Sequence, residues 1–180
     1  MKKLKAVASR AGLVAFALLA VSCTESTSPE RSRSIPSFSY SPNGVSLSRS
    51  VGTLAQSGNF LIKGFNPSNP HPGDAIVATF FWVGSTMIID SVVDVITTNP
   101  YTRVGNTYRL VEYIQAGGRS MATYVATNVQ GFVDASTDPG QILAVAAYLS
   151  QSVSDGGLTL SAFTGVDDNF TAALGAHNSK

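Results

Sequence analysis

Residues 75–83 are AIVATFFWV, a nine-residue run that is apolar at every position except Thr79. β-branched and aromatic residues favour extended strands, in which alternate side chains point to opposite faces. Both faces of this run are apolar, with Ile76, Phe80 and Trp82 on one and Val77, Phe81 and Val83 on the other. Such a strand is typical of the centre of a sheet that is covered on both sides. The run therefore predicts the central strand of a β fold.

The segments on either side of this run have the same character. They are short and rich in Val, Ile, Thr, Tyr and Phe, and they are separated by Gly, Pro, Asn and Asp. The predicted strands are 45–51, 58–65, 75–83, 87–95, 106–114, 120–129, 141–149 and 157–165. About eight short strands without an amphipathic helix predict an all-β fold, an antiparallel β-sandwich of the immunoglobulin-like or jelly-roll-like kind. This domain is expected to span residues 44–168, followed by a polar tail at 169–180.

Composition excludes two classes of protein. The chain has 180 residues, of which 44% are apolar, so it can form one domain with a sizeable core. Its 12 basic and 11 acidic residues leave a net charge of +1, without the basic footprint of a nucleic-acid-binding protein. A single cysteine cannot form a disulfide within the chain, which excludes a disulfide-stapled mini-domain.

The N-terminus has the pattern of a secretory signal. Residues 1–10 contain four basic residues and no acidic one, and an apolar run follows at 11–21. Eleven helical residues span roughly 16 Å, about half of the ~30 Å hydrocarbon core of a bilayer. The run is too short for a transmembrane helix and has the length of a signal-peptide core.

The end of this run carries the only cysteine of the chain. Residues 19–23 are LAVSC, a stretch of small residues before Cys23 that resembles the lipobox of bacterial lipoproteins, with Ala20 where leucine is usual. The resemblance implies that the signal peptide, residues 1–22, is cleaved, and that Cys23 is lipidated and anchors the protein to the membrane. Thr24 in place of aspartate implies sorting to the outer membrane of the cell envelope. The alternative is an ordinary signal peptide with an incidental cysteine.

The stretch between the anchor and the domain, residues 23–43, is expected to be a flexible tether. It is dominated by Ser, Thr and Pro, and Pro29, Pro36 and Pro42 interrupt any helix. A segment of this composition buries too little apolar surface to offset the entropy lost on ordering.

A second resemblance lies within the domain. The motifs are Gly73-Asp74, Trp82, SVVD at 91–94 and GNTY at 105–108. They are similar, across about residues 60–166, to a repeated β-sandwich module of bacterial secreted surface proteins. The resemblance implies a sandwich with a role at the cell surface, and none of the motifs points to a specific chemistry.

Catalytic and metal-binding patterns are weak. Asp90 and Asp94 share a face of one predicted strand, but their separation of roughly 13 Å exceeds the ~5 Å or ~6.5–9.5 Å of a glycosidase pair. Glu112 approaches them only if its strand is a neighbour. His71 and His177 are far apart, lack zinc-site spacing, and are expected to be solvated loop residues. The sequence therefore predicts a non-enzymatic protein without a resident cofactor.

Ligand-binding candidates are mainly aromatic. Trp82, Tyr108 and Tyr113, with Glu112 beside them in the sequence, are candidates for an aromatic platform that binds sugars. A tryptophan on a strand that is apolar on both faces is, however, more often a core residue. Three arginines on or next to strands are further candidates for binding a ligand, and the alternative is that they are solvated residues at strand edges. Oxygen-rich loop segments suit Ca²⁺, and the alternative is that they form ordinary turns. The arginines are Arg103, Arg109 and Arg119, and the loop segments are Asp134 to Asp138, Asp155 and Asp167-Asp168-Asn169.

Together, these features predict a lipid-anchored β-sandwich of the bacterial envelope with a role in adhesion, ligand binding or envelope architecture. The expected partners are the membrane and a cell-surface glycan or protein. A dedicated polysaccharide-binding module is the alternative, and it predicts a solvent-facing Trp82 or tyrosine pair. A glycan hydrolase is the third hypothesis, which requires Glu112 within roughly 5–10 Å of Asp90 or Asp94.

Overall fold

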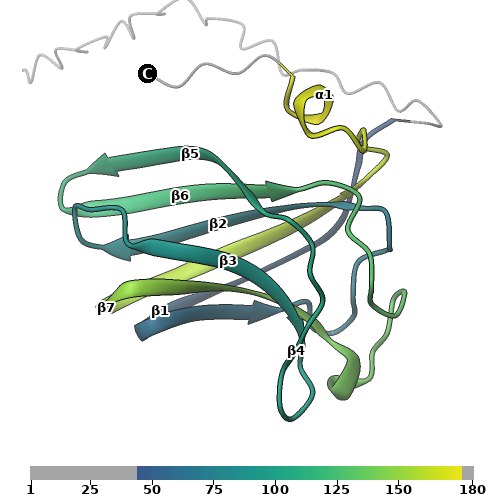
Figure 1. The fold of residues 1–180 in the computed structure, drawn as a ribbon, viewed down its shortest axis with the longest axis horizontal. Helices are drawn as coiled ribbons and strands as arrows, with labels where there is room; N and C mark the ends of the chain where they lie inside the picture. Colours follow the sequence, from purple (N-terminus) through teal and green to yellow (C-terminus); the bar gives the residue numbers. More distant parts are fainter. Residues whose placement is uncertain (1–43, 176–180) are drawn as a thin grey trace, which may run out of the picture. The chain divides into compact units, whose positions relative to one another are not determined.

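The computed structural model describes residues 44–175, which form seven β-strands, a short 3₁₀ helix and one short α-helix (Figure 1). The elements are β1 (Ser46–Gly64), β2 (Ala75–Val83), β3 (Ile89–Ile96), β4 (Thr102–Arg103), β5 (Arg109–Ala116), β6 (Arg119–Ala126), the 3₁₀ helix η1 (Pro139–Gln141), β7 (Leu143–Thr164) and α1 (Phe170–Leu174). The signal peptide, Cys23 and the tether lie outside the described residues. Within residues 44–175, no helix is long and apolar enough to cross a bilayer.

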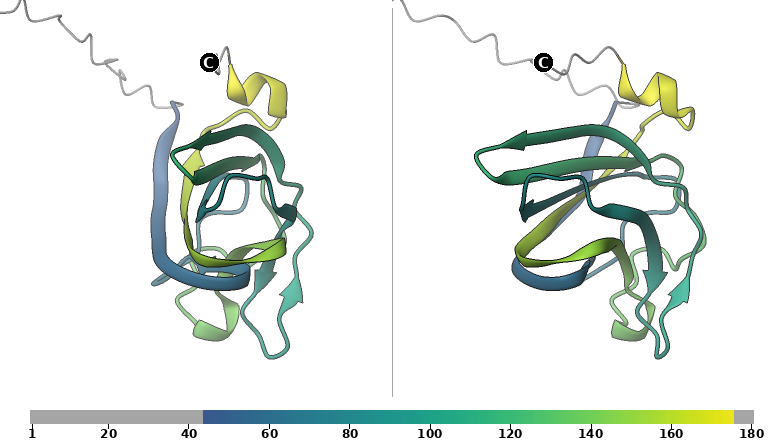
Figure 2. Two further views of the ribbon diagram at one scale, coloured as in Figure 1. Left: turned by 90° about the vertical axis from the view of Figure 1, so that its left-hand side faces the viewer. Right: turned by 60° about the vertical axis from the view of Figure 1, so that its left-hand side comes forward.

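All strand pairs are antiparallel and belong to one sheet. The order is β4-β3-β7-β2-β6-β5, and β1 also pairs with β7. The prediction of an all-β, antiparallel fold is confirmed. The sheet is continuous and curls into an open half-barrel, whereas the sequence predicted two stacked sheets (Figure 2).

Two long strands make the sheet curl. The first part of β7, up to Leu149, pairs with β3, and the part from Gly156 onward pairs with β2. β1 follows the opposite edge of β7 along both parts, with register shifts between Thr53 and Phe60. Ala55 and Gly58 have φ values of 57° and 106° there. Such bulges bend a strand and increase its twist, so β1 and β7 both cross from one half of the sheet to the other.

The prediction of separate strands at 45–51 and 58–65, and again at 141–149 and 157–165, was wrong. Each pair is one continuous strand, β1 or β7. The glycines that suggested a turn in β7 serve close packing. A Cβ on Gly157 would lie against the Thr53 carbonyl oxygen and 2.6 Å from the Phe81 ring. Only glycine lets β7 approach β1 and β2 so closely at the bend.

The core lies inside the curl, on one face of β2. Ile76, Ala78, Phe80 and Trp82 are at most 2% exposed, whereas the alternate residues Val77 and Phe81 on the outer face are half-buried. As predicted, β2 lies in the interior of the strand order, between β7 and β6. Other fully buried core residues include Leu61, Phe65, Leu143, Leu158 and Leu160.

Candidate functional site

The motif residue Asp94 holds a loop in place. Its side chain, on β3, is buried, and its Oδ1 accepts hydrogen bonds from the backbone N–H groups of Gly105 (3.0 Å) and Asn106 (3.2 Å). The Asn106 amide donates to Asp94 Oδ2 and also exchanges two hydrogen bonds of 2.9 Å with the backbone of Gln130. SVVD and GNTY, which are separate motifs in the sequence, therefore meet, and they fix the loop that leads into β5.

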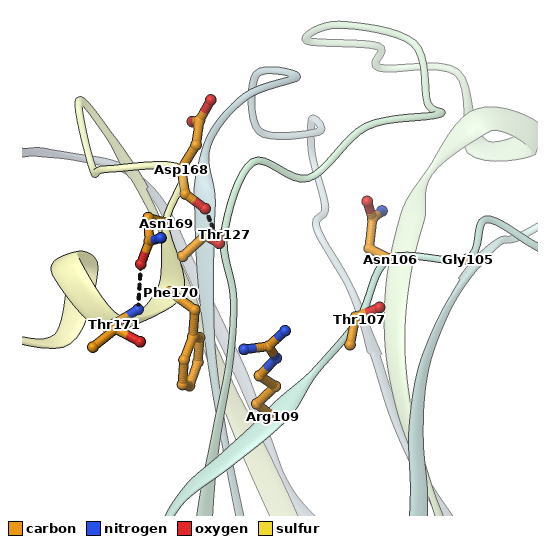
Figure 3. Close-up of a pocket in the computed structure, with 9 residues that line it drawn as sticks. All are labelled: Gly105, Asn106, Thr107, Arg109, Thr127, Asp168, Asn169, Phe170 and Thr171. Atoms are coloured by element: carbon orange, nitrogen blue, oxygen red, sulfur yellow. Dashed lines mark hydrogen bonds between the residues drawn. The ribbon is translucent and has the colours of Figure 1, made fainter.

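This loop forms one wall of a cavity of about 490 Å³, which we call the Arg109 pocket (Figure 3). The pocket lies where β5 begins and β6 has ended, and the segment around the start of α1 forms its other wall. Its lining residues are Gly105, Asn106, Thr107, Arg109, Thr127, Asp168, Asn169, Phe170 and Thr171.

Arg109 provides the only cationic side chain among the residues that line this pocket. Its guanidinium carbon lies 4.9 Å from the centroid of the Phe170 ring, a cation–π distance. Within residues 44–175 the one salt bridge is His71–Asp134, so Arg109 forms no salt bridge with a described carboxylate. In Figure 3 the guanidinium projects into the space between Phe170 and Thr107. Its N–H donors are thus held in place by the ring and face the pocket.

The wall opposite the loop is held by local hydrogen bonds. Thr127 Oγ1 donates to the backbone oxygen of Asp168 (2.8 Å), and the Asn169 side chain accepts from the N–H groups of Thr171 and Ala172. The Asp168 carboxylate points away from Arg109 (Figure 3). The Asn169 oxygen is therefore engaged, and the inward-facing charge is positive. The sequence had assigned residues 169–180 to a polar tail, and α1 forms within that segment.

Such an arrangement suits an anion. A guanidinium presents N–H donors in a fork that matches a carboxylate, and charge-assisted hydrogen bonds of this kind are stronger than neutral ones. The Thr107 hydroxyl adds a donor on the same wall. Sequence reasoning grouped Arg109 with Arg103 and Arg119. It missed Phe170, whose contact with Arg109 joins distant parts of the chain.

A second cavity, of about 320 Å³, lies beside the bend in β1. We call it the Trp82 pocket, and its lining residues are Leu54, Ala55, Phe81, Trp82, Val83, Arg119, Ser120, Asp155 and Gly156. Trp82 itself is 2% exposed, its Nε1 donates to the Thr86 carbonyl oxygen (3.2 Å), and its ring stacks on Tyr113. Trp82 thus lies on the core face of β2, as the apolar character of both faces of this strand favoured, and does not face solvent as the alternative of a dedicated polysaccharide-binding module required.

The two candidate tyrosines also contribute to the interior. Tyr108 has a buried hydroxyl without a hydrogen-bond partner among the described residues. Burial, and then the nearby charge of Asp94, raise its pKa well above the ordinary value of 10.0. Tyr113 forms a hydrogen bond of 3.0 Å with Ser120, which donates to the Gly84 carbonyl oxygen. These rings support the walls of the sheet and do not form an exposed platform.

Glu112 is separated from the other predicted carboxylates by the strand order. It is half-buried on β5, opposite Thr123, and β7, β2 and β6 lie between β5 and β3 in the sheet. On β3, Asp90 is exposed, whereas Asp94 is buried and hydrogen-bonded to the loop. The sheet thus places neither Asp90 nor Asp94 on a strand next to Glu112.

The polar loop residues serve as structural contacts. His71 Nδ1 lies 2.6 Å from Asp134 Oδ1 at an exposed position, and Asp138 accepts a hydrogen bond from the backbone N–H of Gly140. Asp167 accepts one from the N–H of Asn169. Among residues 44–175, no three His, Cys, Asp or Glu side chains gather as metal ligands would. His177 lies outside the described residues.

A scan against protein-family models, a search of curated proteins and a search of solved structures each found no match.

Proposed function

We propose that this is a non-enzymatic protein of the bacterial envelope, anchored in the outer membrane through lipidated Cys23, that binds an acidic polysaccharide in the Arg109 pocket. The anchoring rests on the resemblance of residues 19–23 to a lipobox. Two or more acyl chains supply the attachment that stable membrane binding requires. The β domain is proposed to be a variant of the β-sandwich, with its two halves joined through β1 and β7.

The observation that carries the binding proposal is the stacking of Arg109 on Phe170 beside an open polar cavity. The aromatic ring orients the guanidinium, so less rotamer entropy is lost when a ligand binds. A cation without a carboxylate partner inside the described domain is available for a carboxylate from outside it. A volume of about 490 Å³ falls within the range of small-ligand sites, such as a site for one or two sugar units.

A polymeric sugar acid suits this site because the pocket also offers neutral hydrogen-bonding groups. Thr107 and Thr127 bring hydroxyl groups to the lining, and sugar hydroxyls both donate and accept hydrogen bonds. A non-enzymatic role is supported by the engagement of both Asp94 carboxylate oxygens in holding the 105–106 loop.

Binding to polygalacturonate, a uronic-acid polymer, tests the proposal. The full chain, purified in a detergent without a sugar headgroup, is expected to bind polygalacturonate and to bind neutral dextran at least 10-fold more weakly. Arg109→Gln is expected to weaken polygalacturonate binding roughly 10-fold or more, because a charge-assisted hydrogen bond contributes about 1.5–3 kcal/mol. Arg103→Gln removes the same charge from β4 and should leave binding unchanged. Equal affinities for the Arg109→Gln variant and the unaltered protein would overturn the proposal.

The anchor has a separate test. Cys23→Ser is expected to release the protein from membranes or to leave the precursor uncleaved. Unchanged processing and membrane partitioning would contradict lipidation at Cys23.

A further inference from the structure

We propose that the Trp82 pocket is a second carbohydrate subsite, which takes an uncharged pyranose ring. The inference rests on the proposed function for the identity of the polymer, while its geometry and chemistry are independent of Arg109. It assigns a role to a cavity whose lining combines apolar walls with one cation and one anion.

The two pockets lie at opposite ends of the same strand. Arg119 and Ser120 begin β6 and line the Trp82 pocket, whereas Thr127 follows the end of β6 and lines the Arg109 pocket. Eight residues of strand separate Arg119 from Thr127, which corresponds to roughly 26 Å at ~3.3 Å per residue. Arg119 pairs with Val83 on the outer face of β2, so its side chain also lies on the outer face of the sheet. Arg109 pairs with Val125, which in turn pairs with Val77 on the outer face of β2, so Arg109 lies on the same face. A single extended polysaccharide that contains both acidic and uncharged sugars would meet both pockets along this face.

The walls of the Trp82 pocket present apolar surface to solvent. Leu54 is 74% exposed and Val83 45% exposed, although both are large hydrophobic residues. Phe81, on the half-buried outer face of β2, also lines the pocket. A lining that combines an aromatic ring with aliphatic side chains matches the C–H face of a sugar ring, which packs as an apolar surface.

The backbone at the rim is strained. Ala55 adopts a φ of 57°, a left-handed conformation that non-glycine residues rarely occupy. This bulge is what places Leu54 at the edge of the pocket, because β1 changes register here against β7. Backbone strain of this kind persists where the surrounding structure enforces it and is concentrated at binding sites.

The charges at the rim select an uncharged polar ligand. Arg119 and Asp155 both line the pocket, and neither forms a salt bridge with the other or with any other residue in 44–175. An entirely apolar ligand would desolvate both charges without replacing their hydrogen bonds to water. An anion attracted by Arg119 would be repelled by Asp155, and a cation attracted by Asp155 would be repelled by Arg119, so the pair favours neither charge. Neighbouring sugar hydroxyls can accept from the guanidinium and donate to the carboxylate at the same time.

The chain contains one tryptophan, and Trp82 is among the residues that line this pocket, so indole fluorescence reports on occupancy. The probes are methyl β-glucopyranoside, methyl β-galactopyranoside and methyl α-mannopyranoside, with glycerol as a polyol that has no ring. At least one glycoside is expected to shift Trp82 emission with a dissociation constant on the order of 1 mM, typical of a ligand of this size. Saturation-transfer NMR on the same samples measures binding independently of fluorescence.

Variants localise the response. Arg119→Gln and Asp155→Asn are each expected to weaken glycoside binding roughly 10-fold, while the matched changes Arg103→Gln and Asp90→Asn at exposed positions on β4 and β3 leave it unchanged. Absence of both a fluorescence shift and saturation transfer with all three glycosides would overturn the proposal. Glycoside binding by the Arg119→Gln and Asp155→Asn variants that is as tight as binding by the unaltered protein would also overturn it. Because these probes carry no charge, a lack of glycoside binding would not contradict polygalacturonate binding at Arg109. A lack of polygalacturonate binding would likewise not contradict glycoside binding in the Trp82 pocket.

Discussion

Asp94 accepts two hydrogen bonds from Asn106, one from its backbone N–H and one from its side-chain amide. The carboxylate is buried, and it also accepts from the N–H of Gly105. Asn106 in turn binds the backbone at Gln130. One buried carboxylate thus connects β3, the loop before β5 and the loop after β6, and so sets one wall of the Arg109 pocket.

Asp94→Asn is expected to destabilise the domain by about 2–4 kcal/mol. The new side-chain amide would place an N–H donor against the N–H donor of the Asn106 side chain. It would also replace the charged acceptor of the two backbone hydrogen bonds with a neutral one, which weakens them. Urea denaturation of the full chain measures the loss. Asp90→Asn, at an exposed position on the same strand, should change stability by less than about 0.5 kcal/mol. Equal stability of the two variants would contradict a structural role for Asp94.

Trp82→Ala should cost about 3–5 kcal/mol in the free energy of unfolding, because it removes a large buried ring and leaves a cavity. Tyr101→Ala, at a 56% exposed position, is the control and should cost little. The same denaturation measurement compares them. A Trp82→Ala protein as stable as the unaltered chain would place the indole outside the core.

The raised pKa of Tyr108 predicts that the folded domain loses stability in alkaline solution. Because its pKa is raised in the folded protein, the unfolded chain releases this proton first, near pH 10. Stability is therefore fully present below about pH 10 and decreases as the pH rises toward the folded-state pKa, by up to about 1.4 kcal/mol per pH unit.

Tyr108→Phe should remove this part of the alkaline decline. It should change stability little at neutral pH, because the hydroxyl has no partner within the described residues. Burial also raises the pKa of Tyr124, so a smaller decline should remain. Tyr101→Phe should keep the full decline. Thermal melts between about pH 8 and 11 test this, and an unaltered pH profile for Tyr108→Phe would contradict it.

Gly157→Ala should destabilise the domain by at least about 2 kcal/mol, because the added methyl group would collide with the Phe81 ring and the Thr53 backbone at the bend. Gly140→Ala is the matched control, since its Cβ would meet Asp138 at an ordinary contact distance of 3.5 Å. If both substitutions are tolerated equally in a melt, the close approach of β1, β2 and β7 at Gly157 is not a constraint on the fold.

Strands were predicted correctly from the sequence where the local pattern of apolar residues alone determines the position of the strand. The run at 75–83 coincides with β2, because apolar residues on both faces leave few alternatives to an interior strand. The same reasoning divided β1 and β7, because Asp155-Gly156-Gly157 has the composition of a turn. The requirement for glycine there comes from the neighbouring strands, whose positions depend on contacts between distant parts of the chain. The spacing of apolar residues along the sequence carries no information about those contacts.

The candidate site was predicted less well for the same physical reason. Trp82 was proposed either as a ligand platform or as a core residue, and its place on the same face as Ile76 and Phe80 puts it in the core. Arg109 was one of three comparable arginines. What distinguishes it is Phe170, in a segment that the sequence assigned to a polar tail. Only the folded chain brings the cation and the ring together.

The most direct test of the central claim compares polygalacturonate with its methyl ester by titration against the full chain. The ester keeps the sugar rings and removes the negative charges, so the Arg109 pocket should bind the acid form at least 10-fold more tightly, and salt should weaken that binding. Arg109→Gln should abolish the preference for the acid. Equal binding of acid and ester, or a preference that persists in the Arg109→Gln variant, would contradict a carboxylate site at Arg109.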